Sequence, residues 1–159
     1  MSDPLAYFIT WTVYGSRLQG DARGWRKNGV HRLPEPYLEA WHKQRLKHPI
    51  IKLKREMRSI VENEFHRLAN HYDWKIWECA ARSNHCHIAV TANGLAGDVV
   101  RDRFKANATR VLREHFPVFR NRDVWTAKGD WECINTEEEL ELVCQYIREC
   151  QDLMHLPKF

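Results

Sequence analysis

Residues 85–91 read His-Cys-His-Ile-Ala-Val-Thr, and this stretch decides the fold. Its small and β-branched apolar residues favour a strand, in which successive side chains alternate between two faces. His85 and His87 therefore lie on one face, with Cα atoms roughly 6.5 to 7 Å apart, while Cys86 points to the other. Two imidazoles at this spacing are able to share one cation, which predicts a divalent-metal site. The alternative is a pair of strand histidines with no ligand role.

The neighbouring segments extend this strand into a sheet. Residues 74–81 predict a second strand, which pairs antiparallel with 85–91 across the short connection 82–84. Residues 7–14, Tyr-Phe-Ile-Thr-Trp-Thr-Val-Tyr, alternate and predict a central strand. From there to Pro36, four glycines among polar and basic residues indicate a long functional loop.

Two helical stretches surround the paired strands. The pattern from Pro36 to His71 is helical, with a break at Pro49 because the residue before a proline disfavours helix. Another helix runs from about Asp98, a suitable N-cap, to His115. Helices that precede and follow the strand pair in the sequence indicate a sheet whose surface is covered by helices.

The C-terminal part predicts a hairpin and a last helix. Residues 124–126 and 131–134 flank a Lys-Gly-Asp turn signal and predict a short hairpin. Thr136 with Glu139 forms a capping box that starts the last helix. Its inner face is expected to carry Leu140, Val143, Cys144 and Ile147. The order strand, helix, strand, strand, helix, hairpin, helix predicts an α+β fold, a ferredoxin-like antiparallel sheet covered by helices.

Length and composition indicate one domain spanning residues 1–159, because 159 residues with 43% hydrophobic content suffice for one core and not for two. No run of 18 apolar residues exists, and the N-terminus lacks the order of a secretory signal, so we expect a cytoplasmic protein without a membrane partner. The five cysteines are odd in number and lack C-x-x-C spacing. They indicate reduced thiols rather than a structural zinc site.

Charge is unevenly distributed along the chain, although the net charge is only +4. Residues 43–58 hold seven Lys or Arg against one acid, and residues 101–122 hold seven against two. Residues 130–152 hold eight acids against one base. This asymmetry indicates one face suited to a polyanion, and the seven tryptophans add candidates for base stacking. An ordinary solvated helix face is the alternative.

At this point a family resemblance becomes visible. Residues 83–90, Ser-Asn-His-Cys-His-Ile-Ala-Val, resemble the Asn-His-x-His strand of HUH nucleases, specifically of single-tyrosine transposases related to the REP-associated tyrosine transposases. Similar marks run through nearly the whole chain: the first strand at 7–15, a loop at 18–25, the nucleophile-bearing helix at 104–113, and C-terminal marks at 124–125 and 146–147.

The resemblance implies a metal-dependent reaction on DNA, with Mg²⁺ or Mn²⁺ as the cofactor. In that family a tyrosine from the following helix attacks the phosphate that the metal orients, which leaves a 5′-phosphotyrosine and a free 3′-hydroxyl. The substrate is single-stranded or hairpin DNA, and a homodimer is the assembly found among relatives.

Aligning residues 104–110 with the family helix puts Asn107 at the nucleophile position. An amide is no substitute for a phenol, so the usual tyrosine chemistry is expected to be absent. Helical spacing puts Asn107 at the edge of the buried face of this helix, where it is expected to act as a third metal ligand or to bind a phosphate. The alternative is a boundary polar residue that bonds nearby backbone. The other nucleophiles considered are a metal-activated water, ranked first, Tyr146, ranked second, and Tyr14. Tyr146 fits the packing face of the last helix, so a core position is the alternative for it.

The expected DNA contacts are basic side chains from the loop and both central helices: Arg17, Arg23, Lys52, Arg55, Arg103, Lys105 and Arg110. The leading hypothesis is a transposase-like protein that binds single-stranded or hairpin DNA and carries a divalent-metal site at His85 and His87. Two alternatives are a catalytically inactive DNA-binding regulator and a metal-dependent nuclease that uses water. RNA remains an alternative ligand, because a basic groove with stacking aromatics suits both nucleic acids.

Overall fold

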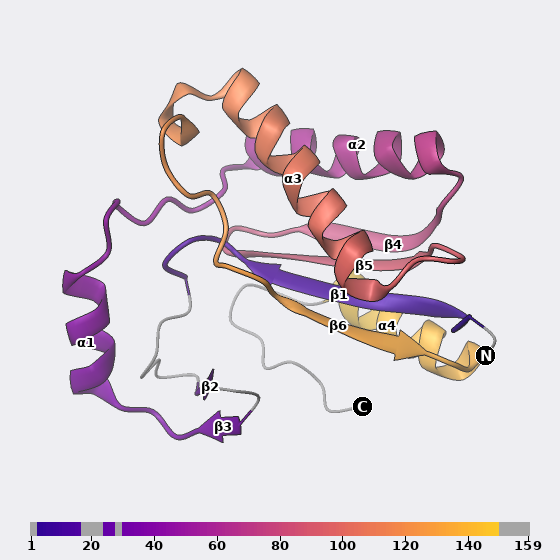
Figure 1. Cartoon of the computed structure of the whole chain (residues 1–159), viewed down its shortest axis with the longest axis horizontal. Helices are drawn as coiled ribbons and strands as arrows, with labels where there is room; N and C mark the ends of the chain where they lie inside the picture. Colours follow the sequence, from indigo (N-terminus) through magenta and orange to yellow (C-terminus); the bar gives the residue numbers. More distant parts are fainter. Residues whose placement is uncertain (1–2, 17–23, 28–29, 150–159) are drawn as a thin grey trace.

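A four-stranded antiparallel sheet forms the centre of the computed structural model, which describes residues 3–16, 24–27 and 30–149. Its strands follow the order β4 (Lys75–Ala81), β5 (His85–Thr91), β1 (Ala6–Thr12) and β6 (Asp130–Ile134) (Figure 1). The expected antiparallel pairing of 74–81 with 85–91 is confirmed, with Cys79 opposite Ile88. Residues 7–14 are confirmed as a central strand, since β1 pairs with β5 on one side and β6 on the other.

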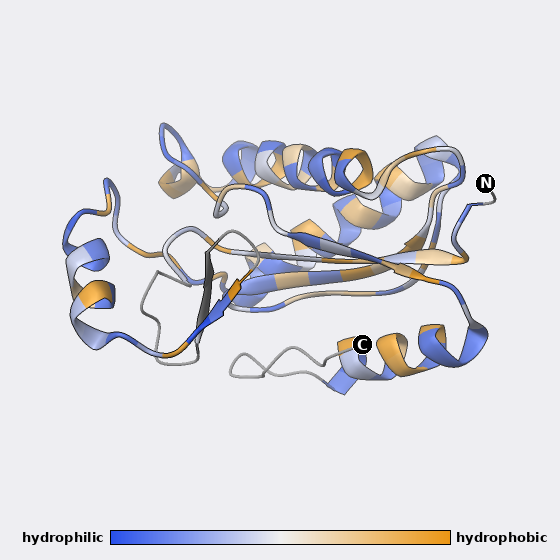
Figure 2. Cartoon of the chain, turned by 60° about the horizontal axis from the view of Figure 1, so that its bottom comes forward, coloured by the Kyte–Doolittle hydropathy of each residue, from blue (hydrophilic) through white to orange (hydrophobic). Residues whose placement is uncertain are grey.

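Helices cover both faces of this sheet. Helices α2 (Arg55–Tyr72) and α3 (Gly97–His115) lie on one face, and α4 (Glu137–Glu149) lies alone on the other (Figures 1 and 2). Successive side chains of β1 point to opposite faces of the sheet and so contribute to both cores. Ile9 packs toward α2 and α3, and Phe8 packs toward α4. The α+β, ferredoxin-like antiparallel sheet predicted from the sequence is therefore confirmed.

The last helix begins as its capping signal predicts. The backbone N–H of Glu139 donates to Thr136 Oγ1 at 3.1 Å, and Glu139 accepts from the backbone N–H of Asn135 at 3.0 Å. The predicted inner face is also confirmed. Its four residues are all buried: Leu140, Val143, Cys144 and Ile147.

The predicted helix from Pro36 to His71 is interrupted more widely than a single break at Pro49. Helix α1 (Pro36–Gln44) ends early, and α2 resumes only at Arg55. The intervening chain is held against the turn between β4 and β5, since the Leu53 backbone N–H donates to the carbonyl of Ser83 at 2.7 Å and the Leu53 side chain is buried. Helix α1 has no buried residue and stands apart from the sheet (Figure 1).

The long loop expected before Pro36 contains a short strand pair, β2 (Trp25–Lys27) with β3 (Val30–Arg32). The sequence prediction missed it because strands of three residues are too short to show periodicity.

The hairpin predicted between 124–126 and 131–134 is wrong. Both segments instead pair with β1 and its extension, β6 by a full ladder and Trp125 by a bridge to Val13. The free edge of a central strand offers them more hydrogen bonds than they offer each other. The predicted turn is present between them, with Lys128 (φ 63°) and Gly129 (φ 125°) in the left-handed region.

Helix α3 begins two residues earlier than predicted. Ala96 is its N-cap, and Asp98 lies in the first turn, where its carboxylate accepts from the Val99 backbone N–H at 2.9 Å. Gly97 permits this start because a Cβ there would lie 2.3 Å from the ring of Trp131. The close approach ties α3 to β6.

Candidate functional site

The two histidines of β5 lie together on the face of the sheet that α4 covers. His85 is opposite Thr12 of β1, and His87 is opposite Thr10. Their ring centroids are 4.4 Å apart. This is the side-by-side arrangement that residues two apart on a strand adopt.

Each imidazole is held through its Nδ1 atom. Thr10 Oγ1 lies 2.9 Å from His87 Nδ1, and Asn84 Oδ1 lies 2.6 Å from His85 Nδ1. Because the Asn84 amide oxygen only accepts, Nδ1 of His85 carries the proton of this hydrogen bond, and Nε2 is the atom through which the neutral ring would bind a metal. Hydrogen bonds of this type orient metal-binding histidines in proteins.

Burial keeps His87 neutral. Its side chain is only 1% exposed, and its pKa lies well below the ordinary value because burial disfavours the charged form. The nearby His85 and Arg82 lower the pKa further. A neutral imidazole is the form that binds metals.

These donors fit part of a divalent-metal site. Two oriented imidazoles, one of them neutral, supply two ligands, and a phosphate oxygen or water would complete the set. Among residues 3–16, 24–27 and 30–149, no third His, Cys, Asp or Glu joins them. The metal site itself stays a prediction.

Tyr146 of α4 lies directly against His87. Its ring centroid is 5.4 Å from that of His87 in an edge-on arrangement, and 6.1 Å from that of Phe8. The side chain is half-buried at the margin of the α4 core. A phenol thus stands next to one of the two potential metal ligands.

Arg82 fixes the end of α4 that carries Tyr146. From the turn between β4 and β5, its guanidinium donates to the carbonyls of Ile147 at 2.8 Å and Arg148 at 3.2 Å. These carbonyls belong to the last turn of the helix, where an arginine is favourable. Arg148 adds an ion pair with Glu78 of β4 at 3.2 Å. The same turn that leads into His85 therefore anchors the tyrosine's helix.

Asn107, expected at the nucleophile position, lies on the opposite side of the sheet. It belongs to α3, whose Phe104 and Ala108 are buried in the core on the α2 side. Its amide donates to the carbonyl of Arg103 at 2.8 Å, one turn earlier. The structure thus separates Asn107 from the histidines, and the expectation that it would join them as a ligand is not met.

The basic residues expected on α3 are engaged within the protein. Arg103 stacks over the ring of Tyr72 at 4.8 Å, and Arg110 forms ion pairs with Glu64 at 2.8 Å and Glu114 at 3.1 Å. Lys105 donates to the Thr126 carbonyl at 3.0 Å.

Lys105 also donates to the carbonyl of Lys128, and burial lowers its pKa. Lys52 and Arg55 are exposed before and at the start of α2. Arg17 and Arg23 lie outside the described residues. Of the expected cations in the described part of the chain, Lys52, Arg55 and Arg110 are thus exposed, and Arg110 is engaged in the two ion pairs given above.

Tyr14, another nucleophile considered, points away from the site. Its hydroxyl accepts from the Lys47 backbone N–H at 3.0 Å, and its ring contacts His48. Tyr14 therefore belongs to a different region beyond the end of β1.

Sequence reasoning assigned no role to Thr10 or Arg82. The role of Thr10 could have been found from the sequence, because Thr10 is two residues from Phe8 on the predicted central strand and therefore points to the same face of the sheet. The role of Arg82 could not, because its partners are backbone carbonyls 65 and 66 residues away.

Comparisons with known proteins agree with the architecture. The model of the family described as "Transposase IS200 like" matches residues 42–150. Among seven solved chains that match is the crystal structure of a "putative transposase" from Deinococcus radiodurans R1, at 11% identity and a TM-score of 0.50, covering 95% of this chain and 94% of that one. At this identity the likeness shows the fold alone. Curated proteins gave no significant match. None of the described helices is long and apolar enough to cross a membrane.

Proposed function

Because the chain belongs to the IS200-like transposase family, we propose that it binds single-stranded or hairpin DNA and cleaves and rejoins one strand with Tyr146 as the nucleophile. On the sequence marks at 18–25 and 83–90, we place it nearest the REP-associated branch, with hairpins of repeated elements as substrates. This proposal moves the nucleophile from the α3 position to α4.

The contact between Tyr146 and His87 carries the proposal. A nucleophile has to reach the phosphate that the electrophilic centre binds, and a ring 5.4 Å from His87 meets that requirement. Asn107 does not, because the sheet stands between it and the histidines. The anchoring of α4 by Arg82 supplies the fixed geometry that such a reaction needs.

The proposed step conserves the number of phosphoester bonds. The Tyr146 oxygen attacks the scissile phosphorus and loses its proton to solvent, and the bond from phosphorus to the 3′ oxygen breaks. That oxygen takes up a proton, leaving a free 3′-hydroxyl and a 5′-phosphotyrosine. Attack by a 3′-hydroxyl on the phosphotyrosine reverses the step and rejoins the DNA without an energy source.

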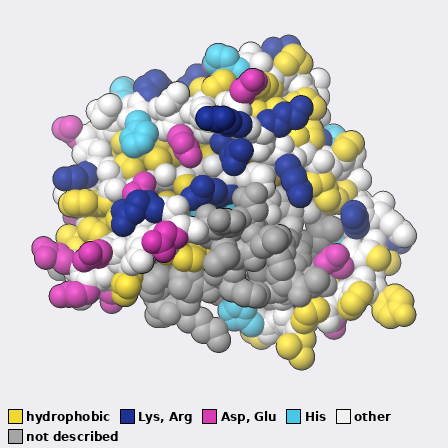
Figure 3. Space-filling view, turned by 180° about the vertical axis from the view of Figure 1, so that it is seen from behind, with side chains coloured by type: hydrophobic (Ala, Val, Ile, Leu, Met, Phe, Trp, Pro, Cys, Tyr) yellow, Lys and Arg dark blue, Asp and Glu magenta, His cyan; other side chains and the backbone are white. Residues whose placement is uncertain are grey.

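His85 and His87 would hold the Mg²⁺ or Mn²⁺ ion. When bound, the ion supplies charge stabilisation at the phosphate oxygens. The residues themselves contribute orientation: Thr10 and Asn84 fix the rings, and burial of His87 excludes water from one side of the site. Lys and Arg side chains gathered on one face of the molecule offer a surface for the DNA backbone (Figure 3).

Two other functions make different predictions. A metal-dependent nuclease would use water and form no covalent intermediate. A binding-only regulator would hold DNA in a salt-sensitive way and leave it intact. The proximity of Tyr146 to the histidines favours the tyrosine mechanism over both.

One experiment separates the three functions. The protein is incubated with end-labelled hairpin DNA carrying single-stranded flanks, with Mn²⁺ or with a chelator, and the products are resolved under denaturing conditions. We expect a metal-dependent protein–DNA adduct that His87→Ala abolishes. Cleavage without an adduct would support the water mechanism, and binding without cleavage would support the regulator.

A further inference from the structure

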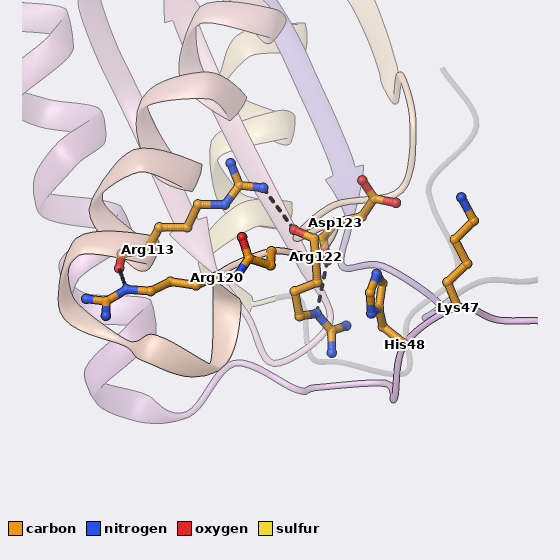
Figure 4. Close-up of a pocket in the computed structure, with 7 residues that line it drawn as sticks. Lys47, His48, Arg113, Arg120, Arg122 and Asp123 are labelled. Carbon is orange, nitrogen blue, oxygen red and sulfur yellow. Dashed lines mark hydrogen bonds between the residues drawn. The ribbon is translucent and has the colours of Figure 1, made fainter.

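A basic hollow lies outside the site described above, between the chain before α2 and the segment after α3. It has a volume of about 600 Å³ (Figure 4). Two regions distant in sequence line it, the chain before α2 and the end of α3 with the segment after it: Lys47, His48, Arg113, Arg120, Asn121, Arg122 and Asp123. Four full positive charges face it against one carboxylate, so it favours an anion. We call it the basic pocket.

Hydrogen bonds to backbone carbonyls hold the arginines of this pocket in place. Arg113 donates to the carbonyls of Arg122 at 2.8 Å and Phe119 at 3.3 Å, and Arg120 donates to the Arg113 carbonyl at 3.1 Å. The close-up shows the hydrogen bonds from Arg113 to the Arg122 carbonyl and from Arg120 to the Arg113 carbonyl (Figure 4). Cations fixed in this way lose less conformational freedom when they bind an anion.

A second hollow of about 470 Å³ lies beside the pocket along α3 and shares Arg113 and Arg120 with it. Arg110 also lines this hollow, but it is ion-paired with Glu64 and Glu114. The two shared arginines are therefore the cations that the second hollow offers to an anion. Two adjacent hollows that share arginines suit an extended polyanion better than one small anion.

The pocket lies beyond the same end of β1 at which the histidines begin. Thr12 is opposite His85, and Tyr14 follows two residues later, about 7 Å further along an extended chain. The Tyr14 hydroxyl accepts from the Lys47 backbone N–H at 3.0 Å, and its ring lies 5.4 Å from the Arg122 guanidinium. Tyr14 thus joins the strand that borders the active site to the basic pocket.

We propose that the basic pocket binds the phosphodiester backbone of the DNA flank that extends past the scissile phosphate. The proposal rests on the DNA-binding function proposed above. Phosphate contacts position the strand without reading its sequence, so the pocket would contribute affinity and register equally for different sequences.

A double-mutant cycle, in which substitutions in the protein are combined with truncations of the DNA and the binding affinity is measured, tests this proposal. The proteins are wild type, Lys47→Gln, Arg122→Gln and the double variant, and the ligands are hairpin oligonucleotides with both flanks or with either flank removed. Lys75→Gln is the matched control, since Lys75 is exposed at the opposite end of the sheet, paired with Thr91. Thermal unfolding verifies that each variant is folded.

We expect removal of one flank to weaken wild-type binding about tenfold, and to weaken the double variant by about twofold or less, because the lost contact is the same. The salt dependence of log Kd should fall in slope by about 1 for each phosphate contact removed. Lys75→Gln should behave as wild type, and the loss should be equal for hairpins of different sequence.

Additive effects of truncation and substitution, with an unchanged salt slope, would overturn the pocket assignment while leaving the proposed function intact. A wild-type protein that binds no DNA would overturn the proposed function as well. The two failures are therefore distinguishable.

Discussion

The two faces of the sheet differ in thickness and in chemistry. On the α2 and α3 face, Trp11, Phe65 and Phe104 are at most 1% exposed and pack edge to face. On the α4 face a single helix covers a smaller core whose margin holds His87 and Tyr146. One face therefore contains the larger buried core, while the other holds the residues that we propose act on DNA.

The substitution Phe65→Ala tests whether the core on the α2 and α3 face stabilises the protein, and it has the largest expected effect. We expect a loss of about 3 to 5 kcal/mol in the free energy of unfolding, because a large aromatic side chain is replaced by a cavity. Urea denaturation measures this loss. Leu142→Ala on the exposed side of α4 is the control and should change stability by less than about 0.5 kcal/mol. Equal effects of the two substitutions would remove the contrast between the faces.

The chemical role of the α4 face is tested by Thr10→Val, which removes the hydroxyl beside His87 Nδ1 while keeping the β-branched shape. We expect Mn²⁺ affinity to fall about 10- to 100-fold, as found when histidine-orienting partners are lost. Calorimetric titration measures the affinity. Thr12→Val is the matched control, since the Thr12 hydroxyl donates to Thr126 and not to a histidine. If both variants bind Mn²⁺ like the wild type, Thr10 does not orient a metal ligand.

A smaller effect distinguishes structural from DNA-binding cations. Arg110→Ala removes the ion pairs with Glu64, which is 5% exposed, and Glu114. Since Arg110 is itself half-exposed and Arg67 still pairs with Glu64, we expect a loss of only about 1 kcal/mol in stability. Lys52→Ala should instead weaken DNA binding and leave stability unchanged. The reverse result would return Arg110 to the DNA-binding surface.

Local patterns in the sequence predicted what depends on local physics. The alternation in 85–91 predicted the strand and put both histidines on one face, and Thr136 with Glu139 predicted the start of α4. Hydrogen bonds and side-chain direction within a few residues determine these features. The sequence was therefore sufficient for the histidine pair.

Contacts between distant elements could not be predicted in the same way. Helical periodicity put Asn107 at the edge of a buried face but did not say which face of the sheet α3 covers. The same limit applies to Tyr146, whose apolar neighbours predicted a core position without showing that His87 adjoins it. The pairing of residues 124–126 and of β6 with the open edge of β1 also depends on the whole topology, and local patterns do not determine it.

Tyr146, and not a residue of α3, is the group that we propose becomes bonded to DNA. The most direct measurement is mass spectrometry of the protein after reaction with hairpin DNA and Mn²⁺, followed by nuclease and protease digestion. We predict a nucleotide mass on the peptide that contains Tyr146, absent in Tyr146→Phe and unchanged in Asn107→Ala. A nucleotide on any other residue, or cleavage of the DNA with no modified peptide, would contradict this account.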